Sequence, residues 1–262
     1  MPQTTGETVI SIRNLRTAFG NQIVHDGVSF DVYRGEVMGV VGGSGTGKSV
    51  LLKEVIGLMH PTDGKVEVFG HCMSSSSDET RHALRRRWGV LFQDGALFSS
   101  LTVAGNIGIV LRELTNLSPA MIDEIAQYKL SIVGLPPEAA YKYPSELSGG
   151  MRKRAGLARA LALDPEIVFL DEPTAGLDPI GATAFDELIL SLKESLGLTV
   201  FMVTHDLDSL AAICDRIAVL VDRRVQVDTL EGHLNATHQW IREYFHGPRG
   251  RAARADHAVA AE

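Results

Sequence analysis

The chain has little cysteine and no long hydrophobic run. Its 262 residues include two cysteines, Cys72 and Cys214, far apart in the sequence. Two distant thiols make neither a disulfide framework nor a zinc site, which favours a reducing compartment. No stretch approaches the ~18 apolar residues of a membrane helix. Residues 1–8 are polar and lack the charged start and apolar core of a signal peptide. We therefore expect a chain that is not secreted and does not cross a membrane, although it can sit on one.

The chain also lacks a positive charge balance. Its 25 Lys and Arg residues face 32 Asp and Glu residues, a formal net charge of −7. This balance argues against a protein that binds nucleic acid. The apolar fraction of 45% argues against a disordered chain. The length corresponds to one large domain or two small ones, with a core that needs no disulfides.

Short strand-like runs alternate with helical patterns, which predicts an α/β fold with a parallel sheet. The strands are expected at 9–15, 28–33, 37–41, 65–69, 90–92, 167–170, 200–204 and 217–222. Residues 50–58 and 118–163 read as helical, with Ser118 as an N-cap and Pro119 in the first turn. We therefore expect a helical subdomain at about 95–165 inserted into an α/β core.

A glycine-rich segment follows the buried run 37–41 and precedes the helical run 50–58. It matches the Walker A pattern, with the residues Gly42, Gly43, Ser44, Gly45, Thr46, Gly47, Lys48 and Ser49. Glycines let backbone N–H groups approach phosphate oxygens, and a helix N-terminus adds partial positive charge. The Lys48 ammonium can reach the β- and γ-phosphates, and the Ser49 hydroxyl can ligate Mg²⁺. The alternative reading is a glycine-rich turn.

The apolar run 167–170 ends in two carboxylates, Asp171 and Glu172. Ligands of open α/β sheets bind at the carboxyl ends of strands. We expect Asp171 to hold Mg²⁺, directly or through water. Because side chains alternate along a strand, Glu172 would point elsewhere and polarise the attacking water as a general base. A strand that simply ends in solvent is the alternative.

The segment Leu147-Ser148-Gly149-Gly150-Met151 precedes a basic helical run. Together with the two phosphate motifs, it resembles the signature of the ATP-binding cassette (ABC) ATPases. The resemblance covers residues 8–232. Further matches in the family's order are Phe19 as the adenine-stacking aromatic, Gln93 as the Q-loop glutamine, Gly176-Leu177-Asp178 as the D-loop and His205 as the switch histidine. Phe19 has a second reading as ordinary core packing.

The resemblance implies a fold and a set of residue roles. The fold is a P-loop NTPase core with a RecA-like parallel sheet, an antiparallel β subdomain, an inserted α-helical subdomain and a C-terminal helical extension. Two cassettes would sandwich two ATP molecules, each between the Walker motifs of one copy and the signature of the other. The implied catalytic residues are Glu172, His205, Gln93 and Lys48. The implied Mg²⁺ ligands are Ser49, Gln93 and Asp171. The implied ATP contacts are Phe19, Gly42, Gly43, Ser44, Gly45, Thr46, Gly47, Lys48, Ser49, Val50, Ser148, Gly149, Gly150 and Asp178.

One residue departs from the family pattern. The fifth signature residue is usually glutamine, and this chain has Met151. The serine and glycine contacts to phosphate do not need that side chain, so we expect hydrolysis to survive.

A closer resemblance is to the Mla-type phospholipid-transport ATPases. It is carried by the sequence around Gln93, by the signature with Met151 in fifth place and by the segment 171–179. This resemblance implies a complex at the cytoplasmic face of a bacterial inner membrane, peripheral through its permease. Two cassettes would carry two permease subunits, a ring of MCE-domain proteins and a small STAS-domain protein, and phospholipid would move between inner and outer membranes. The alternatives are a cassette for another substrate and an ATP-dependent regulatory switch without transport.

Two apolar groups have open interpretations. Leu97, Phe98 and Leu101 are either core residues or a docking site for a permease helix. The extension 233–262 is expected to hold a helix at 234–246 and a tail at 247–262. The helix presents Trp240, Ile241, Tyr244 and Phe245 on one face. That face would fold onto the chain's own core, or the extension would be exchanged between cassettes or dock the STAS protein. The tail arginines Arg249, Arg251 and Arg254 make a weak signal for anionic lipid.

Overall fold

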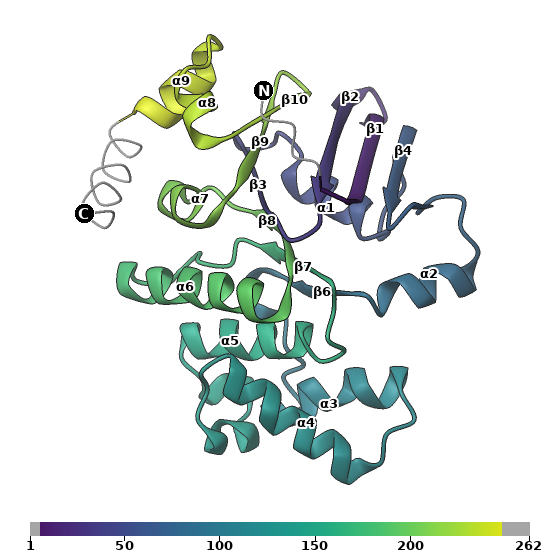
Figure 1. The fold of residues 1–262 in the computed structure, drawn as a ribbon, viewed down its shortest axis with the longest axis vertical. Helices are drawn as coiled ribbons and strands as arrows, with labels where there is room; N and C mark the ends of the chain where they lie inside the picture. The colour runs from purple at the N-terminus through teal and green to yellow at the C-terminus, as the bar shows by residue number, and fades with distance from the viewer. Residues whose placement is uncertain (1–5, 248–262) are drawn as a thin grey trace. The chain divides into compact units, whose positions relative to one another are not determined.

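The computed structural model describes residues 6–247, which form two compact units (Figure 1). The first unit runs to Arg81 and resumes at Thr199, and the second spans His82–Leu198. The boundary falls within helix α2 (Asp78–Arg85). In the part of the chain that the structure describes, no helix has the length and apolarity required to span a membrane.

The first unit contains an antiparallel sheet with the strand order β2-β1-β4-β5. Its strands are β1 (Thr8–Phe19), β2 (Gln22–Tyr33), β4 (Asp63–Val68) and β5 (His71–Cys72). Burial alternates along much of β1 and β2, as expected when one face of a sheet covers a core. This sheet is the expected antiparallel subdomain.

The same unit contains a strand group in the order β10-β9-β3-β8. Its members are β3 (Val37–Gly42), β8 (Thr199–Val203), β9 (Arg216–Val221) and β10 (Arg224–Asp228). The central strand β3 is buried throughout and pairs in parallel with β8 and β9. Strand β10 pairs antiparallel with β9. Helices α1 (Lys48–Val55) and α7 (Leu207–Ile213) follow β3 and β8.

The C-terminal extension differs from the expected single helix at 234–246. Two helices form, α8 (Leu230–Leu234) and α9 (Gln239–His246). Three of the four intervening residues, Asn235, Thr237 and His238, have low helix propensity, and the His238 side chain accepts from the Trp240 N–H to start a new helix. Ile241 and Phe245 are buried against the chain's own core, in agreement with the interpretation that this helix face folds onto that core. The tail arginines that were weighed for contact with anionic lipid, Arg249, Arg251 and Arg254, lie outside the described residues.

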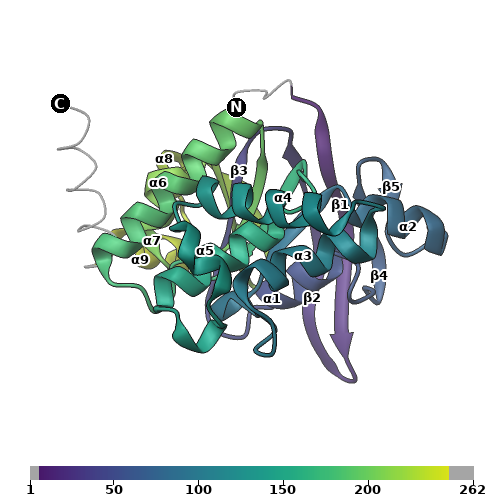
Figure 2. The same ribbon diagram turned by 90° about the horizontal axis from the view of Figure 1, so that it is seen from below.

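The second unit contains two parallel strands and the four longest helices of the described residues (Figures 1 and 2). Its main elements are β6 (Trp88–Leu91), α3 (Val103–Leu114), α4 (Pro119–Ile132), α5 (Gly149–Ala160), β7 (Ile167–Asp171) and α6 (Pro179–Leu196). Short 3₁₀ turns occupy Gln93–Gly95, Pro137–Tyr141 and Pro144–Glu146. Ser118 caps α4 with Pro119 in its first turn, as predicted. Helices α3, α4 and α5 pack together.

Candidate functional site

The Walker A residues connect β3 to the N-terminus of α1 within the first unit. Gly45 and Gly47 have φ angles of 78° and 93°, a region that side chains disfavour. Gly42 has no room for a side chain, because a Cβ there would lie 2.6 Å from the Thr46 Oγ1 and 2.7 Å from the Leu220 carbonyl oxygen. The turn therefore depends on glycine at these positions, and it presents the backbone N–H groups of a helix start.

Lys48 lies over this turn. Its Nζ donates to the carbonyl oxygens of Gly42 and Gly43 at 2.8 and 3.1 Å. The Thr46 hydroxyl also donates to the Gly43 carbonyl, at 2.9 Å. Ser44 and Ser49 are exposed, and Val50 is half-buried in the first turn of α1. The ammonium and the exposed Ser49 hydroxyl thus lie in the same loop and helix start that a phosphate would contact.

A buried polar cluster that was not predicted from the sequence supports α1. Thr17 donates to Glu54 at 2.7 Å and accepts from the His25 Nδ1 at 3.1 Å, and all three residues are buried. A Cβ on Gly47 would lie 2.5 Å from the His25 Nε2. Thr17 and His25 are cross-strand partners in the β1–β2 register. The sequence signal was Glu54, a carboxylate within the largely apolar helical run 50–58.

Two further predicted residues lie in the first unit. Phe19 ends β1 and is 52% exposed, which contradicts the core-packing alternative. His205 is exposed and lies between β8 and α7. Its carbonyl oxygen accepts a hydrogen bond from the Tyr244 hydroxyl at 3.1 Å. Neither residue has an environment typical of core packing.

In the second unit, Asp171 ends β7 and Glu172 follows it with a φ of 50°. A positive φ is uncommon outside glycine and has to be held by surrounding contacts. The Lys153 Nζ, from α5, donates to the Glu172 carbonyl oxygen at 2.7 Å. Burial lowers the pKa of Lys153, while the carboxylates of Asp94, Glu172 and Asp171 act in the opposite direction. A buried cation thus fixes the backbone of the predicted general base.

Lys153→Met is therefore expected to impair both folding stability and hydrolysis. The substitution leaves the Glu172 carbonyl without this donor and removes a positive charge near three carboxylates. We expect a loss of about 1–3 kcal/mol in unfolding free energy and about a tenfold lower hydrolysis rate, measured by urea unfolding and phosphate release. Lys142→Met, on a half-exposed lysine of the same unit, is the control. Wild-type hydrolysis by Lys153→Met would show that this contact does not position Glu172.

Gln93 is exposed at the start of the turn after β6. The following backbone is unusual, with positive φ angles at Asp94, Gly95 and Ala96. The Arg159 guanidinium, from α5, donates to the carbonyl oxygens of Gly95 and Ala96 at 2.9 and 2.7 Å. This anchor was not predicted, because an arginine in a basic helical run gives no indication of its partner.

The signature and D-loop residues lie at helix starts in the same unit. Ser148 is the N-cap of α5 and accepts from the Met151 N–H at 3.2 Å. Ser148 and Gly149 are exposed, and Gly150 is half-buried. Met151 takes part in this cap through its backbone N–H, and its effect on hydrolysis stays a prediction. Asp178 is the N-cap of α6 and accepts from the Gly181 N–H at 2.9 Å.

Comparison with known proteins decides the family. The family model described as ABC transporter matches residues 25–175. This chain belongs to the ABC transporter family. The ABC chain is 37% identical over 258 residues to the probable ribonucleotide transport ATP-binding protein mkl of Mycobacterium leprae. This alignment covers 97% of this chain and 74% of that protein. It is 38% identical over 219 residues to the intermembrane phospholipid transport system ATP-binding protein MlaF of Haemophilus influenzae, covering 84% of this chain and 83% of that protein.

The fold of the ABC chain is also that of a solved cassette. It resembles the ATP-binding cassette MJ0796, a dimer in a post-hydrolysis state bound to ADP and Pi, with a TM-score of 0.76 and 29% identity. The match covers 84% of this chain and 98% of that one. The α/β P-loop fold expected from the sequence is therefore confirmed. This ABC chain is an ATP-hydrolysing subunit of an ABC transporter.

Proposed function

We propose that this ABC ATPase powers the movement of phospholipids between the inner and outer membranes of a bacterium. The observation that carries the proposal is its 38% identity to a protein named for intermembrane phospholipid transport. The sequence features around Gln93 and Met151 support the same assignment. The chain would lie at the cytoplasmic face of the inner membrane, bound through two permease subunits, with MCE-domain and STAS-domain proteins in the same complex.

Transport of ribonucleotides is the second candidate. The protein named for ribonucleotide transport aligns over 97% of this chain, including the C-terminal extension, whereas the phospholipid-transport relative aligns over 84%. Both proteins show nearly the same identity to this chain. The residues that bind ATP do not distinguish the two substrates, because the cargo contacts other subunits of such a transporter.

Each predicted site residue has a proposed role in hydrolysis. Lys48 neutralises charge on the β- and γ-phosphates, and Glu172 accepts a proton from the attacking water. His205 contacts the γ-phosphate, and Gln93 acts in catalysis as the Q-loop glutamine. Phe19 stacks on adenine. In-line phosphoryl transfer needs mainly positioning and charge neutralisation, which these groups provide.

We propose Ser49, Asp171 and Gln93 as the ligands of Mg²⁺ on the chemistry of their side chains. Ser49 offers an exposed hydroxyl, Asp171 a carboxylate at the end of β7, and Gln93 an exposed amide. These are hard oxygen donors, and Mg²⁺ is usually held by one or two carboxylates together with substrate phosphates. When bound, the ion neutralises developing charge on the phosphate oxygens.

A second copy of this chain is proposed to complete each ATP site. Ser148 and Gly149 are exposed at the N-terminus of α5, which has the partial positive charge suited to a phosphate. Through these residues and Gly150, the signature of one copy would contact the γ-phosphate held by the other. Hydrolysis would remove that shared contact and allow the dimer to open.

An apolar surface segment is proposed as the permease contact. Phe98 is 53% exposed, and Leu97 and Leu101 are half-buried beside it. The buried Asn106 holds this segment, since its Oδ1 accepts from the Phe98 N–H at 2.7 Å and its Nδ2 donates to the carbonyls of Phe98 and Leu101 at 3.1 and 3.2 Å. An exposed phenyl ring on a fixed backbone is suited to an apolar helix of a partner.

Phe98→Asp is expected to release the permease without unfolding the cassette. A buried aromatic contact at an interface centre is typically worth 2 kcal/mol or more, so we expect about a thirtyfold loss of permease in co-purification. Tyr141→Asp is the matched control, since Tyr141 is a 76% exposed aromatic of the same unit. If Phe98→Asp retains the permease, the segment is not the contact. If it unfolds the cassette, Phe98 has a core role.

The assembled transporter tests the substrate. We expect the purified complex to transfer labelled phospholipid between vesicles only when ATP is present, and a Glu172→Gln complex to transfer none. The same preparation is tested for ATP-dependent uptake of labelled ribonucleotides. Ribonucleotide uptake without phospholipid transfer would overturn the proposal in favour of the second candidate.

A further inference from the structure

Helix α9 of the C-terminal extension contacts the loop that carries His205. The Tyr244 hydroxyl donates to the His205 carbonyl oxygen at 3.1 Å. The next residue, Asp206, donates through its N–H to the buried Thr204 hydroxyl at 3.0 Å and caps α7. The backbone of His205 is therefore held between the end of β8 and the Tyr244 side chain of α9.

The Tyr244 ring is itself fixed. It stacks on Trp240 with ring centroids 4.9 Å apart and an interplanar angle of 16°. It also meets Phe245 edge to face, with centroids 5.2 Å apart. Because aromatic pairs of this kind restrict one another, the hydroxyl is directed at the loop by rings that are already ordered.

The same helix contacts the Walker A loop. A Cβ at Gly43 would lie 3.7 Å from the Trp240 ring, so the indole lies against this glycine. On the same helix, Ile241 and Phe245 are buried in a cluster with Val41, the residue that precedes Gly42. Helix α9 is therefore packed on the strand that ends in the Walker A loop, and it touches both that loop and the His205 loop.

We propose that Tyr244 is a positioning residue for His205, and that α9 couples the geometry of the His205 loop to that of the Walker A loop. A hydrogen bond to the His205 carbonyl restricts rotation of the adjacent peptide groups, and so restricts the direction of the imidazole. Trp240 holds the same helix against Gly43 of the Walker A loop. This inference rests on the proposed contact of His205 with the γ-phosphate.

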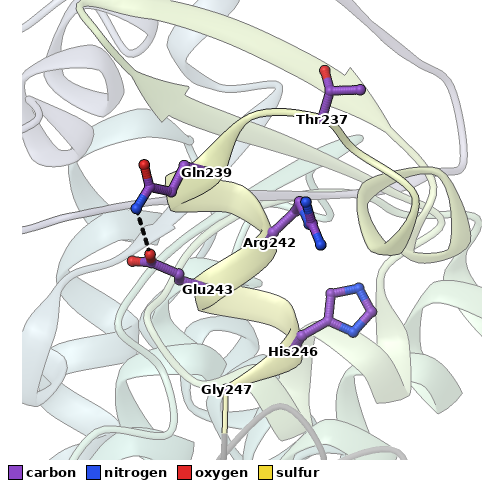
Figure 3. A pocket seen from close by; sticks show the side chains of 6 residues that line it. All are labelled: Thr237, Gln239, Arg242, Glu243, His246 and Gly247. Atoms are coloured by element: carbon purple, nitrogen blue, oxygen red, sulfur yellow. Dashed lines mark hydrogen bonds between the residues drawn. The ribbon is translucent and has the colours of Figure 1, made fainter.

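The exposed face of α9 provides a matched control. Gln239, Arg242, Glu243 and His246 line a concave surface on that face with Thr237 and Gly247 (Figure 3). The Gln239 amide donates to the Glu243 carboxylate at 2.8 Å, as the dashed line in Figure 3 marks. Gln239→Ala therefore removes one hydrogen bond from α9 without changing Trp240 or Tyr244.

Tyr244→Phe in the full-length chain is the decisive variant, because it removes only the hydroxyl. We expect kcat for ATP hydrolysis to fall about two- to tenfold, the usual effect of one hydrogen bond, with the KM for ATP unchanged and the Tm lowered by no more than about 2–4 °C. In a His205→Ala background the same substitution should cause no further loss, because the side chain that it positions is absent. Gln239→Ala should hydrolyse ATP at the wild-type rate.

The outcomes separate this inference from the role of His205. If His205→Ala reduces hydrolysis but Tyr244→Phe does not, the positioning role is wrong and the role of His205 stands. If Tyr244→Phe reduces hydrolysis equally in both backgrounds, or Gln239→Ala has the same effect, α9 acts only through general stability and the inference fails. If His205→Ala hydrolyses ATP normally, both the role of His205 and the inference fail.

Discussion

Glu172→Gln is expected to reduce steady-state ATP hydrolysis about a hundred- to ten-thousand-fold, the usual contribution of general acid–base catalysis. Glutamine has nearly the same size and can keep the backbone position that the Lys153 ammonium holds at 2.7 Å. It cannot accept a proton from the attacking water. Because the Walker A residues are unchanged, ATP affinity should be retained. Phosphate release under multiple turnover, together with equilibrium binding of ATP, measures the two effects separately.

The oligomeric state of Glu172→Gln gives a second readout. A related cassette is dimeric in its post-hydrolysis state, and slow hydrolysis should trap the ATP-bound dimer, so gel filtration with ATP should show more dimer than wild type. Glu187→Gln is the control, since Glu187 is an exposed carboxylate on α6. Wild-type hydrolysis by Glu172→Gln would remove this carboxylate from the catalytic assignment.

Lys48→Ala is expected to weaken ATP binding about ten- to hundredfold. The Nζ donates to the carbonyls of Gly42 and Gly43, so the ammonium lies over the turn whose N–H groups would contact phosphate. Hydrogen bonds to charged groups contribute about 1.5–3 kcal/mol, which corresponds to this loss of affinity. Titration calorimetry with ATP measures it directly.

The matched control for this substitution is Lys53→Ala. Lys53 is exposed in the last turn of the same helix, so its loss changes net charge by the same amount without touching the loop. We expect it to bind ATP with wild-type affinity. Equal affinities for Lys48→Ala and wild type would mean that the phosphates are bound elsewhere.

Local signals predicted the elements that position the ATP motifs. The apolar run at 37–41 became the fully buried β3, and the run at 167–170 became the core of β7. The Ser118–Pro119 pair began α4 as expected, because capping chemistry depends on neighbouring residues alone. The Walker A pattern also predicted glycine where the backbone requires it, since Gly45 and Gly47 have positive φ angles.

Elements whose stability comes from tertiary contacts were harder to predict. Helix α3 contains Gly105 and Gly108, which lower its intrinsic propensity, and packing against α4 and α5 compensates for them. The break before α9 depends on a cap by His238. Likewise, nothing in the spacing of Lys153 or Tyr244 indicates that their side chains reach the backbones of Glu172 and His205.

The measurement that tests the central claim most directly is a purification of the tagged chain from its native membranes in mild detergent, with every co-purifying polypeptide identified. We predict recovery of two permease subunits, an MCE-domain protein and a small STAS-domain protein, with phospholipid bound to the complex. Recovery of a permease with a different substrate-binding protein would contradict phospholipid transport. Recovery of soluble partners alone would contradict transport itself and favour a regulatory switch.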